Sequence, residues 1–201
     1  MATQLASGAI DIRSANGRNG LAAFIDLPNR LYGKNAAYTA PLNLERIETL
    51  NPKKNAYFQH AEGQYWLAFR EGRAVGRISA QVDRLHLERY ADKAGHFGLL
   101  DADDDPDVFN ALLGTAEQWL QEKGMSRIRG PYNLSINEEC GLLVDGFDHP
   151  SMLMMPYAPA YAEQHLIAAG YQKATDLLAY SLYITPDLKI RGERMLTRLA
   201  K

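Results

Sequence analysis

Alternation of apolar and polar residues is clearest between positions 64 and 82. Residues 64–70 (QYWLAFR) and 74–82 (AVGRISAQV) are rich in aromatic and β-branched residues, and the turn sequence Glu71-Gly72-Arg73 separates them. This pattern predicts a β-hairpin. Residues 8–14 (GAIDIRS) alternate in the same way and predict a short strand, and 95–100 (GHFGLL) predict a third, more apolar one.

Helical periodicity is strongest after Pro106. Asp105 suits the cap position, Pro106 the first helical position, and Lys123-Gly124 a helix end. One face of this helix is apolar and holds Val108, Phe109, Leu112, Leu113, Ala116, Trp119 and Leu120. Residues 126–129 (SRIR) follow as a short strand. A strand–helix–strand order with such short connections predicts a parallel pair of strands.

The remaining elements are weaker in the pattern. Residues 21–27 predict a short helix that Pro28 interrupts, 43–50 a second helix, and 159–169 a third that ends at Gly170. The chain then predicts a long strand over 171–184. Together these elements predict an α/β (α+β) fold, whose mixed sheet is antiparallel in its N-terminal strands, has a central parallel pair and is flanked by helices.

Composition narrows the function classes. The chain has 201 residues, of which 46% are hydrophobic, and its 22 basic and 24 acidic residues nearly balance. That balance argues against nucleic acid or a membrane as the main partner. Cys140 is the only cysteine, which excludes an internal disulfide and favours a cytoplasmic location. No signal peptide is expected, and no apolar run reaches the roughly 18 residues of a membrane span.

The densest group of reactive side chains directly follows the predicted parallel strand, in residues 133–147 (NLSINEECGLLVDGF). Ligands of open α/β sheets gather at the carboxyl ends of such strands. Glu138 or Glu139 could take a proton from an attacking amine as a general base. The alternative is a polar loop whose Asn and Ser side chains satisfy the turn backbone.

Two other groups have a structural alternative. Asp83, His86 and Glu88 could be metal ligands, but three such donors also suit a solvated helix start, and no metal site is predicted. The cluster of Met152, Met154 and Met155 could line an adaptable apolar pocket or pack in the core. The pattern leaves both interpretations of the methionines open.

Several segments resemble proteins of the GCN5-related N-acetyltransferase (GNAT) superfamily. Residues 67–82 (LAFREGRAVGRISAQV) are similar to its second and third strands, and 168–184 (AAGYQKATDLLAYSLYI) to its closing helix and last strands. Four further segments resemble a bacterial group of GNAT-like proteins: NPKKNAYFQHAE, AQVDRLH, RGPYNLSINEECGLLVDGF and MMPYAPAYAEQ. The resemblance implies one GNAT-like domain over 1–184, with 185–201 as a basic tail that could begin a second half.

The resemblance implies that acetyl-CoA or another acyl-CoA binds where the two central strands diverge. The backbone contacts to its pantetheine would come from Phe97, Gly98, Leu99 and Leu100. Its pyrophosphate would lie at the N-terminus of the Pro106 helix, where free amides favour anions. Residues 101–108 (DADDDPDV) lack the glycines of the superfamily's motif at this turn, and their carboxylates would repel a pyrophosphate.

The superfamily's general-acid tyrosine falls on Leu166 here, so a nearby tyrosine would have to substitute. The predicted catalytic residues are Glu138, Glu139 and Tyr161, and the predicted substrate-binding residues are Asn133, Ser135, Asn137 and Tyr157. The predicted function is an acyl-CoA-dependent N-acyltransferase with a small-molecule amine or acyl substrate. The alternative is a GNAT-fold binding or scaffold domain without catalysis. An exposed sheet edge would allow a homodimer.

Overall fold

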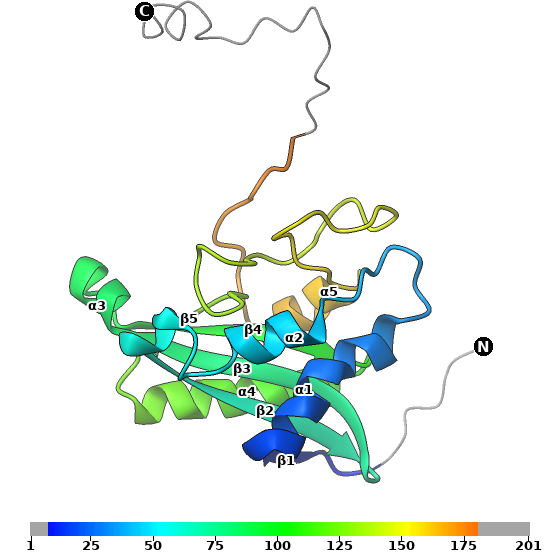
Figure 1. Cartoon of the computed structure of the whole chain (residues 1–201), viewed down its shortest axis with the longest axis horizontal. Coiled ribbons are helices and arrows are strands. Elements are labelled where there is room, and N and C mark those ends of the chain that lie inside the picture. The colour runs from blue at the N-terminus through cyan, green and yellow to red at the C-terminus, as the bar shows by residue number, and fades with distance from the viewer. Residues whose placement is uncertain (1–7, 181–201) are drawn as a thin grey trace, which may run out of the picture.

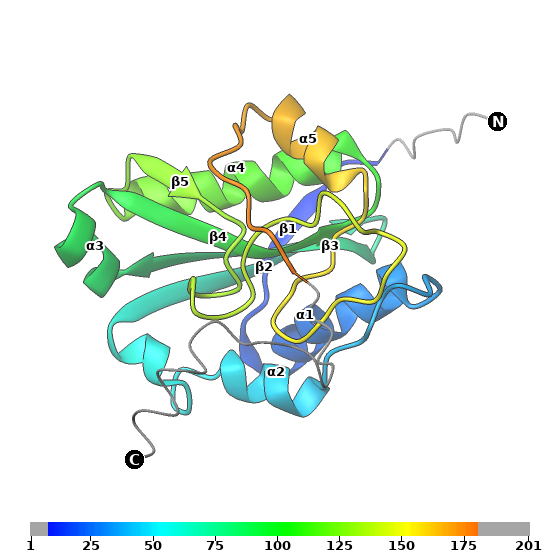
Figure 2. The same ribbon diagram turned by 90° about the horizontal axis from the view of Figure 1, so that it is seen from above.

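A computed structural model describes residues 8–180 and shows a five-stranded sheet between two layers of helices (Figure 1). The strands lie in the order β1-β2-β3-β4-β5. Seen from above, α1 and α2 cover one face of the sheet, and α4 and α5 lie on the other (Figure 2). The elements are β1 (Asp11–Ser14), α1 (Gly17–Tyr32), α2 (Asn43–Thr49), the 3-10 helix η1 (Ala56–Gln59), β2 (Ala61–Arg70), β3 (Arg73–Asp83), α3 (Arg84–Tyr90), β4 (Ala94–Ala102), α4 (Pro106–Glu122), β5 (Arg127–Arg129) and α5 (Ala162–Ala168).

The predicted hairpin is confirmed. Strands β2 and β3 are antiparallel, and Arg70 pairs with Arg73 across a two-residue turn. Both turn residues have positive φ, 51° at Glu71 and 78° at Gly72. This geometry matches the right-handed twist of the strands, and a glycine in the second position adopts it without strain. The strand predicted over 8–14 begins at Asp11 and pairs with β2.

The predicted parallel pair is also confirmed, because β4 and β5 run parallel from Ala94–Arg127 to His96–Arg129. The connecting helix α4 begins and ends where its pattern predicted. Its apolar side packs on the sheet in a core with β2, β3 and α5. In that core the rings of Trp66 and Trp119 meet edge to face at 6.0 Å.

The predicted break at Pro28 is wrong, because α1 continues through it to Tyr32. Proline has no amide hydrogen, so the carbonyl four residues earlier, at Phe24, loses its helical partner. Arg77 on β3 supplies the replacement, since its Nη1 donates to that carbonyl at 2.7 Å. The buried Arg77 also pairs with Asp101 at 2.8 Å, which anchors the helix to the sheet.

The strand predicted after α5 is wrong over 171–180, which form no strand. A strand needs a neighbour to bond its backbone groups. Residues 172–180 are instead exposed, and no strand of the described sheet pairs with them. The rest of that prediction, the proposed domain boundary at 184 and the basic tail lie outside the described residues.

Candidate functional site

Strand β4 carries a bulge at the place where its neighbour leaves it. Gly98 faces Ser79 and Asp101 faces Arg77, so β4 has one more residue than β3 between these pairs. Leu99 in this bulge has a φ of 45°. The regular pairing of β4 with β5 ends at His96 and Arg129, and beyond it the amide of Tyr132 donates to the Phe97 carbonyl at 2.7 Å. The bulge therefore turns backbone groups toward the segment that follows β5.

That segment is fixed to the bulge by hydrogen bonds that are buried or partly buried. Asn133 Oδ1 accepts from the Leu99 amide at 2.8 Å. Gln81, fully buried on β3, donates to the carbonyls of Tyr132 and Leu134 at 2.7 and 3.2 Å. Gly98 is required here, because a Cβ at this position would collide with the Tyr132 carbonyl. Residues 130–134 thus form a strap along the edge of β4.

The strap uses backbone groups that were predicted to bind pantetheine. The Phe97 carbonyl and the Leu99 amide both have protein partners, and Gly98 is covered by Tyr132. Pantetheine could pair with these groups only if the strap moved. Contacts from Phe97, Gly98, Leu99 and Leu100 to a pantetheine stay a prediction.

Glu139 connects the strap to α2. Its carboxylate forms an ion pair with Arg46 on α2 and accepts a hydrogen bond from Asn133 Nδ2 at 2.8 Å. Its backbone carbonyl accepts from the Asn133 amide, also at 2.8 Å. A chain of contacts therefore runs from Arg46 through Glu139 and Asn133 to the Leu99 amide. Both oxygens of Glu139 are engaged, so this side chain is placed to hold Asn133.

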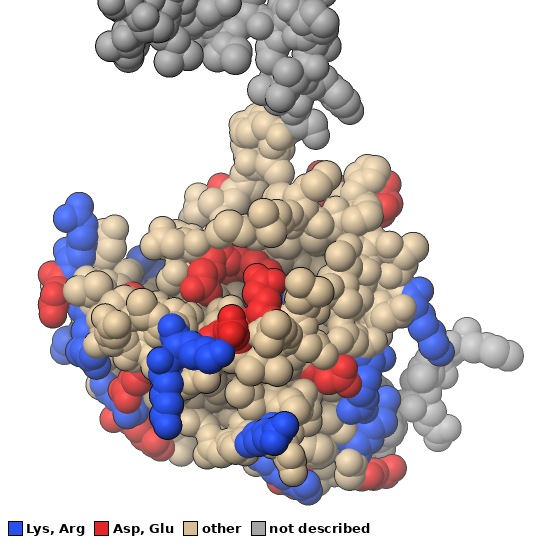
Figure 3. All heavy atoms as spheres, viewed as in Figure 1, with Lys and Arg blue, Asp and Glu red and all other residues tan. Residues whose placement is uncertain are grey.

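The neighbouring Glu138 has a different environment. It is half-buried, and burial raises the pKa of its carboxyl, with a further contribution from the charge of Glu139. Arg46 and Asn55 oppose that rise in pKa without cancelling it. Figure 3, viewed from the same side as Figure 1, shows acidic side chains gathered in a recess near the middle of the visible face. A carboxylate with a raised pKa accepts protons near neutral pH better than an ordinary one does, which suits a general base.

Tyr161 contacts the last residue of β4. Its hydroxyl donates to the Ala102 carbonyl at 2.6 Å, and burial raises the pKa of this phenol. The hydroxyl hydrogen is thus already engaged in a hydrogen bond with the backbone at the end of β4. Leu166, at the position of the superfamily's acid, is buried in the core. Tyr161 as a general acid stays a prediction.

The other predicted substrate-binding residues are spread over the surface. Tyr157 packs with Tyr32 and Tyr38, at ring distances of 5.1 and 5.4 Å, and accepts a hydrogen bond from Asn35. Ser135 Oγ accepts from the amide of the exposed Asn137 at 3.2 Å, a local turn contact. Among these residues only Asn133 belongs to the network around the bulge.

The N-terminus of α4 does not fit a pyrophosphate. Asp105 accepts from the amide of Asp107 and forms a buried ion pair with Arg70, so the helix is capped by its own carboxylate. Asp103 pairs with Arg73, and Asp104 accepts from His165 at 2.7 Å. Negative charge already occupies the end of the helix dipole.

The structure places two further groups, the possible metal ligands around Asp83 and the methionine cluster. Asp83 caps α3 and contacts His60 at 2.9 Å, while His86 contacts Asp92 at 3.1 Å. Over residues 8–180 no cluster of His, Cys, Asp and Glu side chains could hold a metal ion. Residues 152, 154 and 155 of the methionine cluster are 41–73% exposed, which excludes packing in the core. In the same range, no helix has the length and apolar composition that a membrane crossing requires.

Comparison with solved structures decides the fold. An aminoglycoside acetyltransferase from an uncultured soil metagenomic sample superposes with a TM-score of 0.51 at 15% identity, over 87% of this chain and 96% of its own. AAC(6')-Iy in complex with a CoA bisubstrate analogue gives 0.50 at 12% identity, over 88% and 99%. A predicted acetyltransferase with acetyl-CoA from Clostridium acetobutylicum gives 0.50 at 10% identity, over 86% and 96%. The chain has the GNAT fold.

Two curated relatives are much closer in sequence. The chain is 48% identical over 179 residues to a protein of Caulobacter vibrioides named bacterial ceramide synthase. It is 45% identical over 183 residues to protein YghO of Escherichia coli. Each match includes 89% of this chain and 47% of the relative, so the chain spans about half the length of these relatives. No protein-family profile matches the chain.

Sequence reasoning missed several residues that this version of the GNAT fold brings to Glu138. Arg46 and Asn55 lower the pKa of its carboxyl. The charge of Glu138 is in turn one of the causes that raise the pKa of the Tyr57 and Tyr65 phenols. The segment NPKKNAYFQHAE contains two of them, and its only signal is its resemblance to the GNAT-like group. Its spacing carries no signal that links it to a carboxylate some eighty residues later.

Proposed function

We propose that the chain is part of an acyl-CoA-dependent N-acyltransferase whose acceptor is a lipid amine. The observation that carries this proposal is the half-buried Glu138, with its raised pKa, on the segment fixed to the β4 bulge of a GNAT fold. The relative named bacterial ceramide synthase supports the acceptor class. A ceramide is the amide of a fatty acid with a long-chain amino alcohol, which is what N-acylation of a lipid amine produces.

Glu138 would act on the amine before it attacks. An alkylamine is mostly protonated at neutral pH and has no free electron pair. The carboxylate would take one proton from the ammonium group, and the neutral amine nitrogen would then be free to attack the acyl carbonyl. The new C–N bond would replace the C–S bond of the thioester, and CoA would leave as a thiolate that takes up the second proton lost by the nitrogen. Glu139, Asn133 and Arg46 hold the loop that carries this base, while acyl-CoA would supply the acyl group. The end of α4 does not fit its pyrophosphate, and we assign no residue to that group.

The test is the rate of amide formation from a long-chain amine and an acyl-CoA. We expect Glu138→Gln to lower kcat/KM by about 10²–10⁴-fold, the usual contribution of a general base. In the unmodified protein kcat/KM should fall at low pH with an apparent pKa above the ordinary glutamate value, because Glu138 must be ionised. Glu138→Gln should abolish that acidic limb.

Glu45→Gln on α2 is the matched control, since this exposed glutamate forms no ion pair among the described residues. Its kcat/KM should equal that of the unmodified protein. A Glu138→Gln variant with full activity and an unchanged pH profile would contradict the proposed base.

A second candidate is a GNAT-fold domain that binds an amine without catalysis. The observation in its favour is the N-terminus of α4, where Asp105 already caps the helix and pairs with Arg70. Such a domain would be stabilised by the amine and would form no amide with any acyl-CoA. The same assay therefore separates the two functions.

A further inference from the structure

One side chain, that of Asn133, closes the backbone amide in the β4 bulge. The Leu99 amide donates to Asn133 Oδ1 at 2.8 Å, and Asn133 Nδ2 donates to the Glu139 carboxylate at 2.8 Å. Leu99 is 4% exposed, and the regular pairing of β4 with β5 has already ended at His96. The carboxamide of Asn133 therefore takes the place of a carbonyl that a neighbouring strand would offer to β4.

The strap does not depend on this side chain for its position. The Tyr132 amide donates to the Phe97 carbonyl at 2.7 Å, which pairs the strap with β4 through backbone atoms alone. Gln81 donates to the carbonyls of Tyr132 and Leu134 at 2.7 and 3.2 Å. The Leu134 side chain is 1% exposed and packs in the core on the α1 side of the sheet. The backbone of the strap therefore stays fixed when the Asn133 side chain rotates.

A short polar chain holds the Asn133 side chain in place. Its Nδ2 is bound to Glu139, and Glu139 is paired with Arg46 on α2. The side chains of Arg46 and Glu139 are 16% and 23% exposed, so water reaches this end of the chain of contacts. Rotation of one side chain is also far faster than displacement of a segment. The Leu99 amide can thus change partners without a change in the fold.

We propose that the Asn133 side chain is a gate that competes with a carbonyl oxygen of the acyl donor for the Leu99 amide. This inference rests on the proposed function and concerns the regulation of that same site. An acyl thioester offers an uncharged carbonyl oxygen, which accepts one N–H just as Asn133 Oδ1 does. Glu138, the proposed base, directly precedes Glu139 in the chain. The gate therefore opens next to the segment that carries the base.

The affinity for the donor tests the gate, because competition predicts a sign that a supporting role does not. We expect Asn133→Ala to lower the Kd for octanoyl-pantetheine by about 2–10-fold, the range that corresponds to one net hydrogen bond. In this variant the thioester bonds the Leu99 amide without first displacing a partner. Tm should fall, because the fold loses two hydrogen bonds. A Kd that rises or stays unchanged would overturn the gate.

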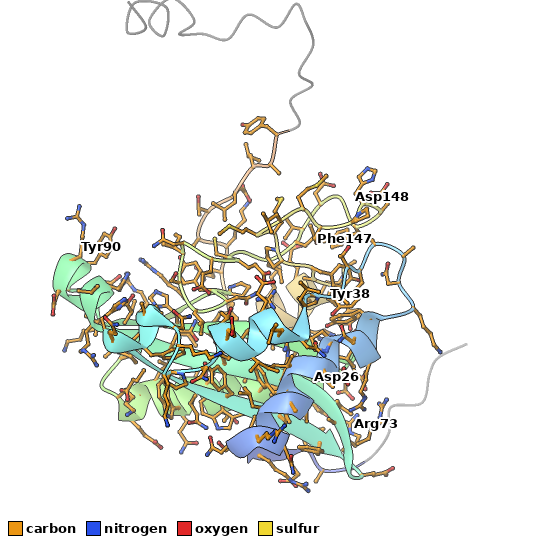
Figure 4. The ribbon with its side chains drawn as sticks, viewed as in Figure 1. Asp26, Tyr38, Arg73, Tyr90, Phe147 and Asp148 are labelled. Carbon is orange, nitrogen blue, oxygen red and sulfur yellow. The ribbon has the colours of Figure 1, made fainter. Side chains whose placement is uncertain are left out.

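Asn35→Ala is the matched control, because Asn35 makes the same two kinds of contact. Its Oδ1 accepts from the Ala37 amide at 2.9 Å, and its Nδ2 donates to the Tyr157 hydroxyl at 2.8 Å. Its carbonyl accepts from the amide of Tyr38, which lies by the C-terminal end of α1 (Figure 4). Asn35→Ala should lower Tm and leave the Kd unchanged. Equal decreases in Kd for the Asn35 and Asn133 variants would assign the effect to a general loosening and overturn the gate.

Nuclear magnetic resonance follows the exchange of partners directly. In the unmodified protein, octanoyl-pantetheine should shift the side-chain amide signal of Asn133, while the Leu99 and Tyr132 amides stay protected from hydrogen exchange. In Asn133→Ala, the Leu99 amide should exchange quickly until the thioester restores its protection. An Asn133 signal that does not move at saturation, or a Leu99 amide that the thioester fails to protect, would refute the competition.

Failure of this inference is distinguishable from failure of the proposed function. Binding of the thioester without release of Asn133 would overturn the gate and leave the acyltransferase standing. Tighter binding in Asn133→Ala, with no amide formed from a long-chain amine, would support the gate and remove the proposed function. If the thioester binds neither the unmodified protein nor this variant, no donor carbonyl takes the Leu99 amide and the gate is overturned.

Discussion

His96 lies on β4 with its ring 4.8 Å from that of His86 and 4.9 Å from that of Tyr132. Its side chain is buried, and burial together with the charge of His86 lowers the pKa of the imidazole from 6.5 to about 4. The folded protein therefore keeps His96 neutral over a pH range in which the unfolded chain binds a proton. Folding then becomes less favourable as the solution is acidified.

The sign and size of this effect can be tested. The contribution of His96 to stability is complete above pH 6.5 and is lost as the pH falls toward 4. The loss is about 3 kcal/mol, at 1.36 kcal/mol for each pKa unit. The variant His96→Phe keeps an aromatic ring and cannot titrate. Between pH 7 and pH 4, we expect its free energy of unfolding to fall by about 3 kcal/mol less than that of the unmodified protein. Denaturant titrations at pH 7 and pH 4 measure it, and parallel losses in the two proteins would refute it.

At the scale of elements, α4 depends on a charge at its N-terminus. Burial alone would raise the pKa of Asp105, but the hydrogen bond from Arg70 holds that pKa below its ordinary value. The two side chains are 7% and 10% exposed, so each charge depends on the other. The same carboxylate that begins the helix therefore joins it to the end of β2.

Asp105→Asn tests this link, because asparagine still caps a helix but carries no charge. We expect the free energy of unfolding to fall by roughly 2 kcal/mol or more, since the buried Arg70 loses its counter-charge. Asp107→Asn is the matched change two residues further along, at a side chain that is 79% exposed. It should cost less than about 1 kcal/mol. Equal effects in urea titrations would show that the buried pair has no special role.

At the scale of the whole molecule, the GNAT fold is kept while two of its usual acyl-CoA contacts are used by the protein. The strap of residues 130–134 pairs with the edge of β4, and carboxylates fill the end of α4. The curated relatives are about twice as long as this chain. The acyl donor is therefore expected to gain little from its pyrophosphate at α4.

Thermal shifts with an acyl-CoA and with the corresponding acyl-pantetheine test this expectation. Both should raise Tm by similar amounts at equal concentration, because stabilisation follows the ratio of ligand concentration to its Kd. Adenosine 3′,5′-bisphosphate, the control without pantetheine, should leave Tm unchanged. A much larger shift with acyl-CoA would reveal a pyrophosphate site that contradicts the α4 geometry. No shift with either thioester would favour the non-catalytic domain.

Elements with local causes were predictable from the sequence. The hairpin needs only two strands and the Glu71-Gly72 turn between them, and α4 carries its own cap, apolar face and end. Continuity of α1 through Pro28 was not predictable, because Arg77 from a distant strand supplies the missing donor. The strand predicted over 171–180 failed for a similar reason, since pairing depends on a neighbour that no local pattern reveals.

By itself, the sequence determined a mixed sheet with an antiparallel hairpin and a parallel pair of strands, and it marked residues 133–139 as the candidate site. Only the tertiary structure separated the roles of the two adjacent acids. Glu139 is bound to Arg46 and Asn133, whereas Glu138 is left half-buried, and burial raises the pKa of its carboxyl. The reason is physical: periodicity reports which face of an element is buried, but a carboxylate's basicity depends on the charges and hydroxyls that folding brings to it from elsewhere in the chain.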